Sequence, residues 1–295
     1  MQSEFVKINS NDYFVRTWGS PENPKILLLH GFPEHSNSWS KIAKYLKNSY
    51  YLIAPDQRGF GLSWAPVEEK YYRTSSITKD LKSLIEHYDD NVTVLGHDWG
   101  AATAYSLCFN YPKLVNNLII LNGVHPILFQ KALLSGGKQT KASRYINFLL
   151  KDNAKEVLKE NNFQKLIELF SKNMDISWLD EITKKQYITE WSRPGKLETM
   201  LNWYKASPIL IPNKKNPETS IDLDNKKYDV TCPHLLIWGE KDTALLSESY
   251  QGLEEYCKEL EIIKFKDADH WLHHQKPEEI TTLIHQWLLK KYSNK

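Results

Sequence analysis

The hydrophobic pattern of residues 1–124 alternates between two kinds of segment. Short continuous apolar runs, such as 25–29 and 92–95, stand between segments whose apolar residues recur at helical spacing, such as 75–88. Continuous runs of this length are typical of strands buried on both faces, and strands that alternate with amphipathic helices form a parallel sheet with right-handed crossovers. This part of the chain therefore predicts an α/β fold, a mostly parallel sheet with helices on both faces, preceded by a hairpin over residues 5–19.

The strand pattern of the chain is interrupted once. It returns at 233–242 and 260–270, after a long Lys-rich stretch with helical spacing and no strand-like run. We therefore predict a core domain of residues 1–124 and 230–295, interrupted by a helical cap of residues 125–229 that is large enough to be a domain. We expect helices over 130–150, 152–170 and 179–192, a loop over 207–229 and a closing helix from Pro277.

Composition and charge exclude several classes of function. The chain has 295 residues, 41% of them hydrophobic, and a formal net charge of +2, which creates no strong field for nucleic acid or a membrane surface. It has no run of about 18 apolar residues and no signal peptide at its start. Cys108, Cys232 and Cys257 lack metal-ligand spacing and are expected to be free thiols. We expect a cytoplasmic monomer or homodimer without nucleic-acid or membrane partners, metal or cofactor.

Four short motifs directly follow predicted strands. They are HGFP (30–33), GHDWG (96–100), GEKD (239–242) and DHW (269–271). In open parallel sheets ligands bind at the carboxyl ends of the strands, so these motifs mark the expected site. Taken together they resemble an α/β-hydrolase with an inserted helical cap. GHDWG resembles its nucleophile elbow, and Asp98, Asp242 and His270 follow the family order of nucleophile, acid and histidine.

The nucleophile of this elbow is an aspartate, and this decides the chemistry. An aspartate has a reference pKa near 3.9 and is already a carboxylate at neutral pH. Asp98 can therefore attack a saturated carbon and form an ester. His270, oriented by Asp242, is then free to activate the water that hydrolyses the ester. The backbone N–H groups of Phe32 and Trp99 are expected to face the developing oxyanion. This chemistry suits epoxides and alkyl halides.

Some of these residues also have simpler interpretations. Asp98 precedes a predicted helix and is a favourable N-cap. His270 has two neighbours, His273 and His274, that offer the same side chain. We favour His270 because it ends the strand directly, and we expect His97 to be structural because its neighbour carries the chemistry.

Over essentially its full length the sequence resembles the epoxide hydrolases. The resemblance rests on HGFPE (30–34), DQRGFG (56–61), GHDWGAA (96–102) and DADHWLHHQKPEE (267–279). It implies that a small-molecule epoxide is opened to a vicinal diol and that two cap tyrosines donate to the epoxide oxygen. The segments ASRYINFLL and LNWY match those of the family and assign this role to Tyr145 and Tyr204, with Tyr187 as an alternative to the first. The residues expected to line the substrate pocket are His30, Phe32, Trp99 and Trp203.

Two other functions stay open from the sequence. A haloalkane dehalogenase forms the same ester but holds a halide with the Trp after the nucleophile, here Trp99, and a second donor. In one group that donor is an Asn where this chain has Phe32, which offers no side-chain donor. In another group it is a cap tryptophan, for which Trp178, Trp191 and Trp203 are candidates. A non-catalytic ligand-binding relative would have lost a catalytic residue, and this chain retains all of them.

Overall fold

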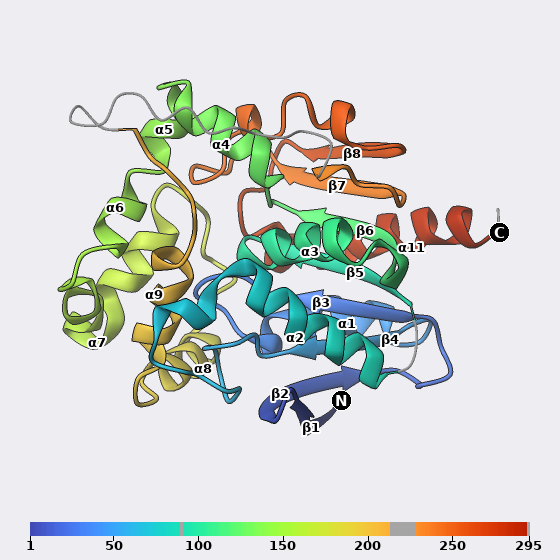
Figure 1. Ribbon diagram of the computed structural model, residues 1–295, viewed down its shortest axis with the longest axis horizontal. Helices are drawn as coiled ribbons and strands as arrows, with labels where there is room; N and C mark the ends of the chain where they lie inside the picture. Colours follow the sequence, from blue (N-terminus) through green and yellow to red (C-terminus); the bar gives the residue numbers. More distant parts are fainter. Residues whose placement is uncertain (89–90, 213–227, 294–295) are drawn as a thin grey trace.

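The fold is built around one eight-stranded sheet. The computed structural model describes residues 1–88, 91–212 and 228–293 (Figure 1). The strands are β1 (Gln2–Ile8), β2 (Asn11–Trp18), β3 (Lys25–Leu29), β4 (Tyr51–Pro55), β5 (Val92–His97), β6 (Val115–Leu121), β7 (His234–Gly239) and β8 (Leu260–Phe265). Their order is β1-β2-β4-β3-β5-β6-β7-β8. The β1–β2 and β2–β4 pairs are antiparallel and all other pairs are parallel. The predicted α/β fold and its hairpin are confirmed.

Helices cover both faces of this sheet. On one face lie α1 (Ser40–Leu46) and α11 (Pro277–Ser293), which follows the short α10 (Leu272–Gln275). On the other face lie α2 (Thr74–His87) and α3 (Trp99–Asn110). In β3, Leu27 and Leu29 join the core beneath α2 and α3. Ile26 and Leu28 join the core beneath α1 and α11. Since successive strand residues point to opposite faces and both faces are buried, the strand has to be apolar throughout.

A helical insertion separates β6 from β7, where the strand pattern was interrupted. Figure 1 shows most of it beyond one end of the strands. Its helices are α4 (Pro126–Leu134), α5 (Lys138–Ala142), α6 (Tyr145–Leu149), α7 (Ala154–Ser171), α8 (Glu181–Trp191) and α9 (Lys196–Lys205). None of the helices in the described residues is long and apolar enough to cross a membrane.

Two helices expected in this insertion are broken. The one expected over 130–150 is split into α4, α5 and α6, because the chain turns at Gly136, whose φ is +71°. The one expected over 152–170 corresponds to α7, but its backbone leaves helical geometry between Glu160 and Phe163. Asn161 and Asn162 have positive φ there, a conformation that asparagine adopts more readily than most residues.

The other two expectations for the insertion have different outcomes. The helix expected over 179–192 is confirmed as α8. Of the loop expected over 207–229, residues 213–227 lie outside the described residues.

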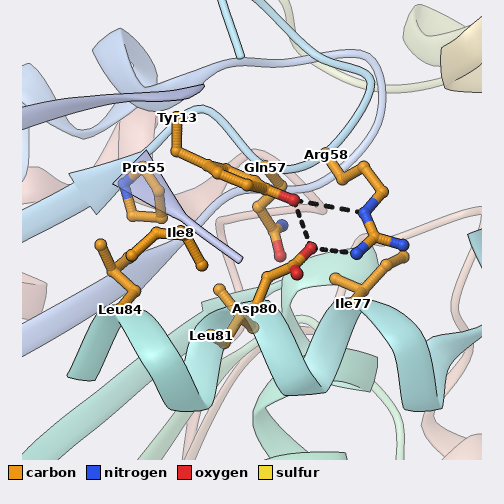
Figure 2. Close-up of a pocket in the computed structure, with 9 residues that line it drawn as sticks. All are labelled: Ile8, Tyr13, Pro55, Gln57, Arg58, Ile77, Asp80, Leu81 and Leu84. Atoms are coloured by element: carbon orange, nitrogen blue, oxygen red, sulfur yellow. Dashed lines mark hydrogen bonds and ion pairs between the residues drawn. The ribbon is translucent and has the colours of Figure 1, made fainter. Parts of the chain in front are cut away.

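A buried ion pair fixes the loop after β4 (Figure 2). The Arg58 guanidinium and the Tyr13 hydroxyl both donate to the Asp80 carboxylate of α2. Beside them is a cavity of about 10 Å³, roughly the space of one water. The carbonyls of the same loop accept hydrogen bonds from α9: Trp203 Nε1 donates to Arg58 O at 2.9 Å, and Thr199 Oγ1 donates to Gly59 O at 2.8 Å. The loop therefore joins the sheet to the helical insertion.

Candidate active site

Asp98 lies on a strained turn between β5 and α3. Its backbone has φ +51° and ψ −120°, a conformation that non-glycine residues adopt only where the surroundings impose it. The turn is tight because α3 lies directly against the sheet: a Cβ on Gly100 would overlap the Leu29 carbonyl, and a Cβ on Gly96 would overlap the carbonyl of Gly100. The Asp98 side chain does not cap α3. The N-cap interpretation is therefore wrong, and the strain must be explained by another role.

Both oxygens of the Asp98 carboxylate face groups suited to catalysis. The backbone N–H of Phe32 donates to Oδ1 at 2.8 Å. Oδ2 lies 3.7 Å from Nε2 of His270. A Cβ on Gly31 would overlap the Asp98 side chain, so the loop after β3 can approach this closely only with glycine there. Trp99, the next residue, begins α3 and lines the cavity described below.

The Asp242 carboxylate holds His270 in a fixed orientation. Its Oδ2 lies 2.8 Å from His270 Nδ1, and its Oδ1 accepts from the N–H groups of Ala244 and Leu245 at 2.8 and 2.9 Å. Burial alone would lower the pKa of His270, but the negative charges of Asp242 and then Asp98 outweigh it and raise this pKa to about 9. This pKa lies above neutral pH and favours the imidazolium form of His270.

Asn122 also takes part in this arrangement, and the sequence did not point to it. Its Nδ2 donates to Asp242 Oδ2 at 2.7 Å and to the carbonyl of Gly239 at 3.2 Å. Its Oδ1 accepts from the Gly239 N–H at 2.7 Å. Asn122 follows β6 and has a φ of +31°. Its position after a strand was the one available signal, because its partner lies 120 residues away.

Tyr145 and Tyr204 reach the same site from the helical insertion. Tyr145 begins α6 and Tyr204 is near the end of α9, and their ring centroids are 6.5 Å apart in an edge-to-face arrangement. Burial raises the pKa of both phenols, and the charge of Asp98 raises both further. Both hydroxyls therefore keep their protons at neutral pH. Tyr187, the alternative to Tyr145, is committed elsewhere: its hydroxyl donates to Glu34 at 2.7 Å.

Glu34 is the centre of a second buried group, the Glu34 cluster, formed by Glu34, His97, Tyr187, His273 and His274. His274 Nε2 lies 2.7 Å from Glu34 Oε1, and His273 Nε2 lies 3.2 Å from Oε2. Burial would raise the pKa of the Glu34 carboxyl, but His273 and His274 outweigh it and hold that pKa well below its usual value. The two histidines that rivalled His270 therefore face this carboxylate.

The Glu34 cluster borders the active site through His97. Its Nε2 lies 2.9 Å from the His270 carbonyl, and its Nδ1 lies 3.5 Å from Glu34 Oε2. Glu34, His97 and His273 have the ligand types of a metal site, with donor atoms within 4.8 Å of one another. The carboxylate, however, already has hydrogen-bonding partners on both oxygens. Glu34 follows the HGFP motif, but its partners could not be read from the sequence.

A cavity of about 440 Å³ opens above Asp98. Asp98, Trp99, Tyr145 and Tyr204 line it, together with Thr74, Ser75, Ala102, Ser106, Phe109, Asn110, Val124, Pro126, Ile127, Phe129, Gln130, Ile146, Ser207, Pro208, Ile209, Tyr228 and Leu245. The Asp98 carboxylate and the two phenols thus line one cavity, with His270 and Asp242 next to Asp98.

Three of the four residues expected in the pocket lining are not among the residues that line this cavity. The expectation is wrong for His30, which is fully buried with Nδ1 3.0 Å from Gly31 O and Nε2 accepting from the Gln57 N–H. It is wrong for Trp203, whose ring nitrogen donates to the core. Phe32 packs edge-to-face on Tyr204 at 5.2 Å between centroids and supports the wall from behind.

The strained turn at Asp98 after β5 is followed along the chain by Asp242 after β7 and His270 after β8, and this order defines a class of fold. Residues 24–277 match the alpha/beta hydrolase fold family. The chain therefore belongs to that family, and it is a hydrolase.

Among the individual proteins to which the chain is similar, several are epoxide hydrolases. The chain is 32% identical over 291 residues to the AB hydrolase superfamily protein YfhM of Bacillus subtilis, covering 98% of each chain. It is 30% identical to human epoxide hydrolase 4, covering 94% of this chain and 75% of that one. A solved epoxide hydrolase from a hot-environment metagenome has a TM-score of 0.88 at 28% identity, covering 97% of this chain and 98% of the other. The Bacillus megaterium epoxide hydrolase solved with an inhibitor has a TM-score of 0.86 at 26% identity, covering 97% and 99%. The resemblance to the epoxide hydrolases is confirmed.

Proposed function

We propose that the protein hydrolyses epoxides to vicinal diols through a covalent ester on Asp98. One observation carries the proposal: the Asp98 carboxylate does not cap its helix but faces a cavity lined by two protonated phenols. A carboxylate nucleophile opposite two hydroxyl donors suits a leaving group that departs as an alkoxide and needs a proton. The solved epoxide hydrolases with similar structures support the same substrate class.

In the first step, an Asp98 oxygen attacks one epoxide carbon. The carbon–oxygen bond of the ring breaks, and its electron pair goes to the epoxide oxygen, which takes a proton from Tyr145 or Tyr204. The ring strain and these two donors together make the oxygen a competent leaving group. The protonated His270, 3.7 Å from the nucleophile, supplies the proton that restores the phenol. This leaves a hydroxyalkyl ester and a neutral imidazole.

In the second step, neutral His270 removes a proton from water, which attacks the carbonyl carbon of the ester. Negative charge develops on the Asp98 oxygen that accepts from the Phe32 N–H, and the Trp99 N–H is the second donor of the proposed oxyanion hole. Asp242 stabilises the imidazolium that forms. The ester carbon–oxygen bond then breaks, and the departing diol oxygen takes the proton held by His270. The second proton of the water passes from the Asp98 carboxyl group to His270, which restores the carboxylate and the imidazolium.

The positions of the tryptophans disfavour the dehalogenase alternative. Of the cap candidates for a second halide donor, Trp191 Nε1 donates to Pro33 O at 2.7 Å and Trp203 Nε1 donates to Arg58 O at 2.9 Å. Trp178 stacks on His274 with 3.8 Å between ring centroids and does not line the cavity. In the described residues, Trp99 is therefore the one tryptophan that faces the site.

A single turnover in heavy-oxygen water tests the ester. With enzyme in excess over a terminal epoxide, we expect the label in the Asp98 carboxylate, because water attacks the carboxylate carbon and not the substrate. The measurement is mass spectrometry of the peptide that contains Asp98. Label found only in the diol would mean that water opens the ring directly and that the proposed ester does not form.

A second experiment removes the two hydroxyl groups that are proposed to protonate the epoxide oxygen. In Tyr145→Phe and Tyr204→Phe the rings remain but one hydroxyl is lost, so each should slow ester formation, and the double variant should lose most of the roughly 10²–10⁴-fold gained from general acid catalysis. An alkyl halide leaves without a proton and would be insensitive to both changes. A double variant that forms the ester from an epoxide at the wild-type rate would remove the proposed role of both phenols.

A further inference from the structure

The cavity extends well beyond the reacting groups. Trp99, Ala102, Ser106, Phe109 and Asn110 line it, and their spacing of three or four residues places them on one stripe of α3. At a rise of about 1.5 Å per residue, this stripe is about 16 Å long. The cavity volume of about 440 Å³ lies within the range of roughly 300–1,000 Å³ for pockets that enclose drug-sized ligands. A small epoxide would occupy its inner end alone.

The outer end of the cavity is polar and open to water. Ser75 and Asn110 line it and are exposed. The first turns of α2 lie against this level of α3, since Thr78 Oγ1 and Ser106 Oγ are 2.8 Å apart. Within α3, Asn110 Nδ2 donates to the Ser106 carbonyl at 2.8 Å. These polar groups are therefore gathered two to three turns of α3 away from the nucleophile.

Most of the remaining lining is apolar. It includes Ile127 and Phe129 of α4, Ile146 of α6, and Ile209 and Leu245 from the chain beyond the insertion helices. An apolar chain gains free energy when it leaves water for such a lining, whereas a polar group placed there loses its hydration. At the outer end, beside the exposed residues Ser75 and Asn110, a polar group can stay hydrated.

We propose that the substrates are elongated epoxides. The ring lies against Asp98, an apolar chain lies along the α3 stripe, and the far end of the molecule carries a polar group that stays in water beside Ser75 and Asn110. This inference rests on the proposed epoxide hydrolase function and adds the shape and polarity of the substrate.

A series of straight-chain terminal epoxides tests the length of the site. Each added methylene should raise kcat/KM about fourfold, which corresponds to about 0.8 kcal/mol per buried CH₂, until the chain reaches Asn110, after which the gain should stop. A hydroxyl at the far end of the longest substrate should be tolerated. The same hydroxyl moved to the middle of the chain should lower kcat/KM by at least tenfold, because it would be buried without a partner.

Two variants test the position of the chain. Ser106→Phe fills the stripe two turns from Asp98, so long and short epoxides should be processed with equal kcat/KM. Thr78 keeps a partner in that variant, because its hydroxyl also donates to the Thr74 carbonyl at 2.7 Å. Lys79→Phe adds the same ring at an exposed position of α2 outside the lining and should keep the wild-type dependence on chain length.

The outcomes separate this inference from the proposed function. Ester formation on Asp98 with every epoxide, but no dependence of kcat/KM on chain length, would overturn the elongated substrate and leave epoxide hydrolysis standing. A chain-length dependence that persists in Ser106→Phe would overturn the placement of the chain along α3. Failure of all chain lengths to form the ester would overturn both proposals.

Discussion

The proposed triad of Asp98, Asp242 and His270 lies beside the Glu34 cluster. Both groups consist mainly of carboxylates and histidines, but in opposite proportions. In the triad one imidazole, His270, lies between two carboxylates. In the cluster one carboxylate, Glu34, lies among three imidazoles. The rings of His97 and His270, one from each group, have centroids only 4.6 Å apart. The histidines of both groups are buried, so burial does not distinguish them.

The proportion of the two residue types decides what each group can do. Burial lowers the pKa of any histidine, and two nearby carboxylates outweigh this at His270 and raise its pKa to about 9. At His273 and His274 burial prevails and the pKa is lowered, although Glu34 opposes it. His270 can therefore exchange a proton during the proposed reaction, whereas burial favours the neutral form of His273 and His274, whose Nε2 atoms lie 3.2 and 2.7 Å from the Glu34 carboxylate.

The largest expected effect is on the rate of ester hydrolysis, and it follows from a mutation in the triad. His270→Gln should slow hydrolysis of the ester by about 10²–10⁴-fold, because the general base is lost while the nucleophile remains. The variant should consume about one epoxide per active site and then accumulate the Asp98 ester as a mass adduct. Rapid-quench mass spectrometry measures both steps.

His273→Gln is the matched control for this change. Its amide can still donate to Glu34, and His270 is untouched, so we expect ester hydrolysis at close to the wild-type rate. If His273→Gln accumulated the ester while His270→Gln still turned over, His273 and not His270 would be the general base.

The effect of intermediate size is the pH dependence of ester hydrolysis. Esterification removes the negative charge of Asp98, which is one of the contributions that raise the pKa of His270 above its ordinary value. The pKa of His270 in the ester must then lie below about 9, and the reaction itself turns the histidine from an acid into a base. Because only the neutral imidazole accepts a proton, ester hydrolysis should speed up about tenfold per pH unit below this pKa and then level off.

Rapid-quench measurements between about pH 5 and pH 8 would check this dependence. The ester should accumulate at the acidic end of the range. A hydrolysis rate that does not change with pH over this range would contradict the prediction, because no proton would then leave His270 before the ester is hydrolysed.

The smallest expected effect is on stability. Glu34→Gln keeps the shape of the side chain but removes the charge, so it should lower the free energy of unfolding by about 1.5–3 kcal/mol at pH 7, the usual range for hydrogen bonds to a charged group. The pKa of Glu34 is lowered by folding, so its contribution is present above the unfolded pKa of about 4.3 and is lost as pH falls through the folded value. Urea unfolding at pH 7, and at the lowest pH at which both proteins stay folded, measures this difference. Equal stability of the two proteins at pH 7 would mean that Glu34 contributes nothing as a charge.

The sheet was predictable because its strands carry their own signal. A run such as Leu27–Leu28–Leu29 is explained by burial on both faces and by little else. Asp98, Asp242 and His270 could be placed for a related reason, since each follows such a run and the carboxyl ends of parallel strands meet at one edge.

The Glu34 cluster, the break in α7 and the lining of the cavity could not be predicted, because they depend on contacts that leave no local pattern in the sequence. His273 and Glu34 are 239 residues apart in sequence, and nothing near either residue specifies the other. The break in α7 depends on two adjacent asparagines, Asn161 and Asn162, whose left-handed backbone is decided by packing and not by helical spacing. The lining of the cavity was mispredicted at His30 because a polar residue at a strand end can serve the core as well as the site.

Several hydrogen bonds from the insertion helices end on main-chain carbonyls of the core, and this affects which sequence changes the core loops can tolerate. Trp191, Thr199 and Trp203 each donate to a main-chain carbonyl of the core loops, those of Pro33, Gly59 and Arg58. A carbonyl is present whatever side chain its residue carries, so the loops can change sequence without losing these acceptors. We therefore expect that a helical segment from a relative can dock on this core where the loop backbone is retained, and that it would bring a different cavity to Asp98, Asp242 and His270.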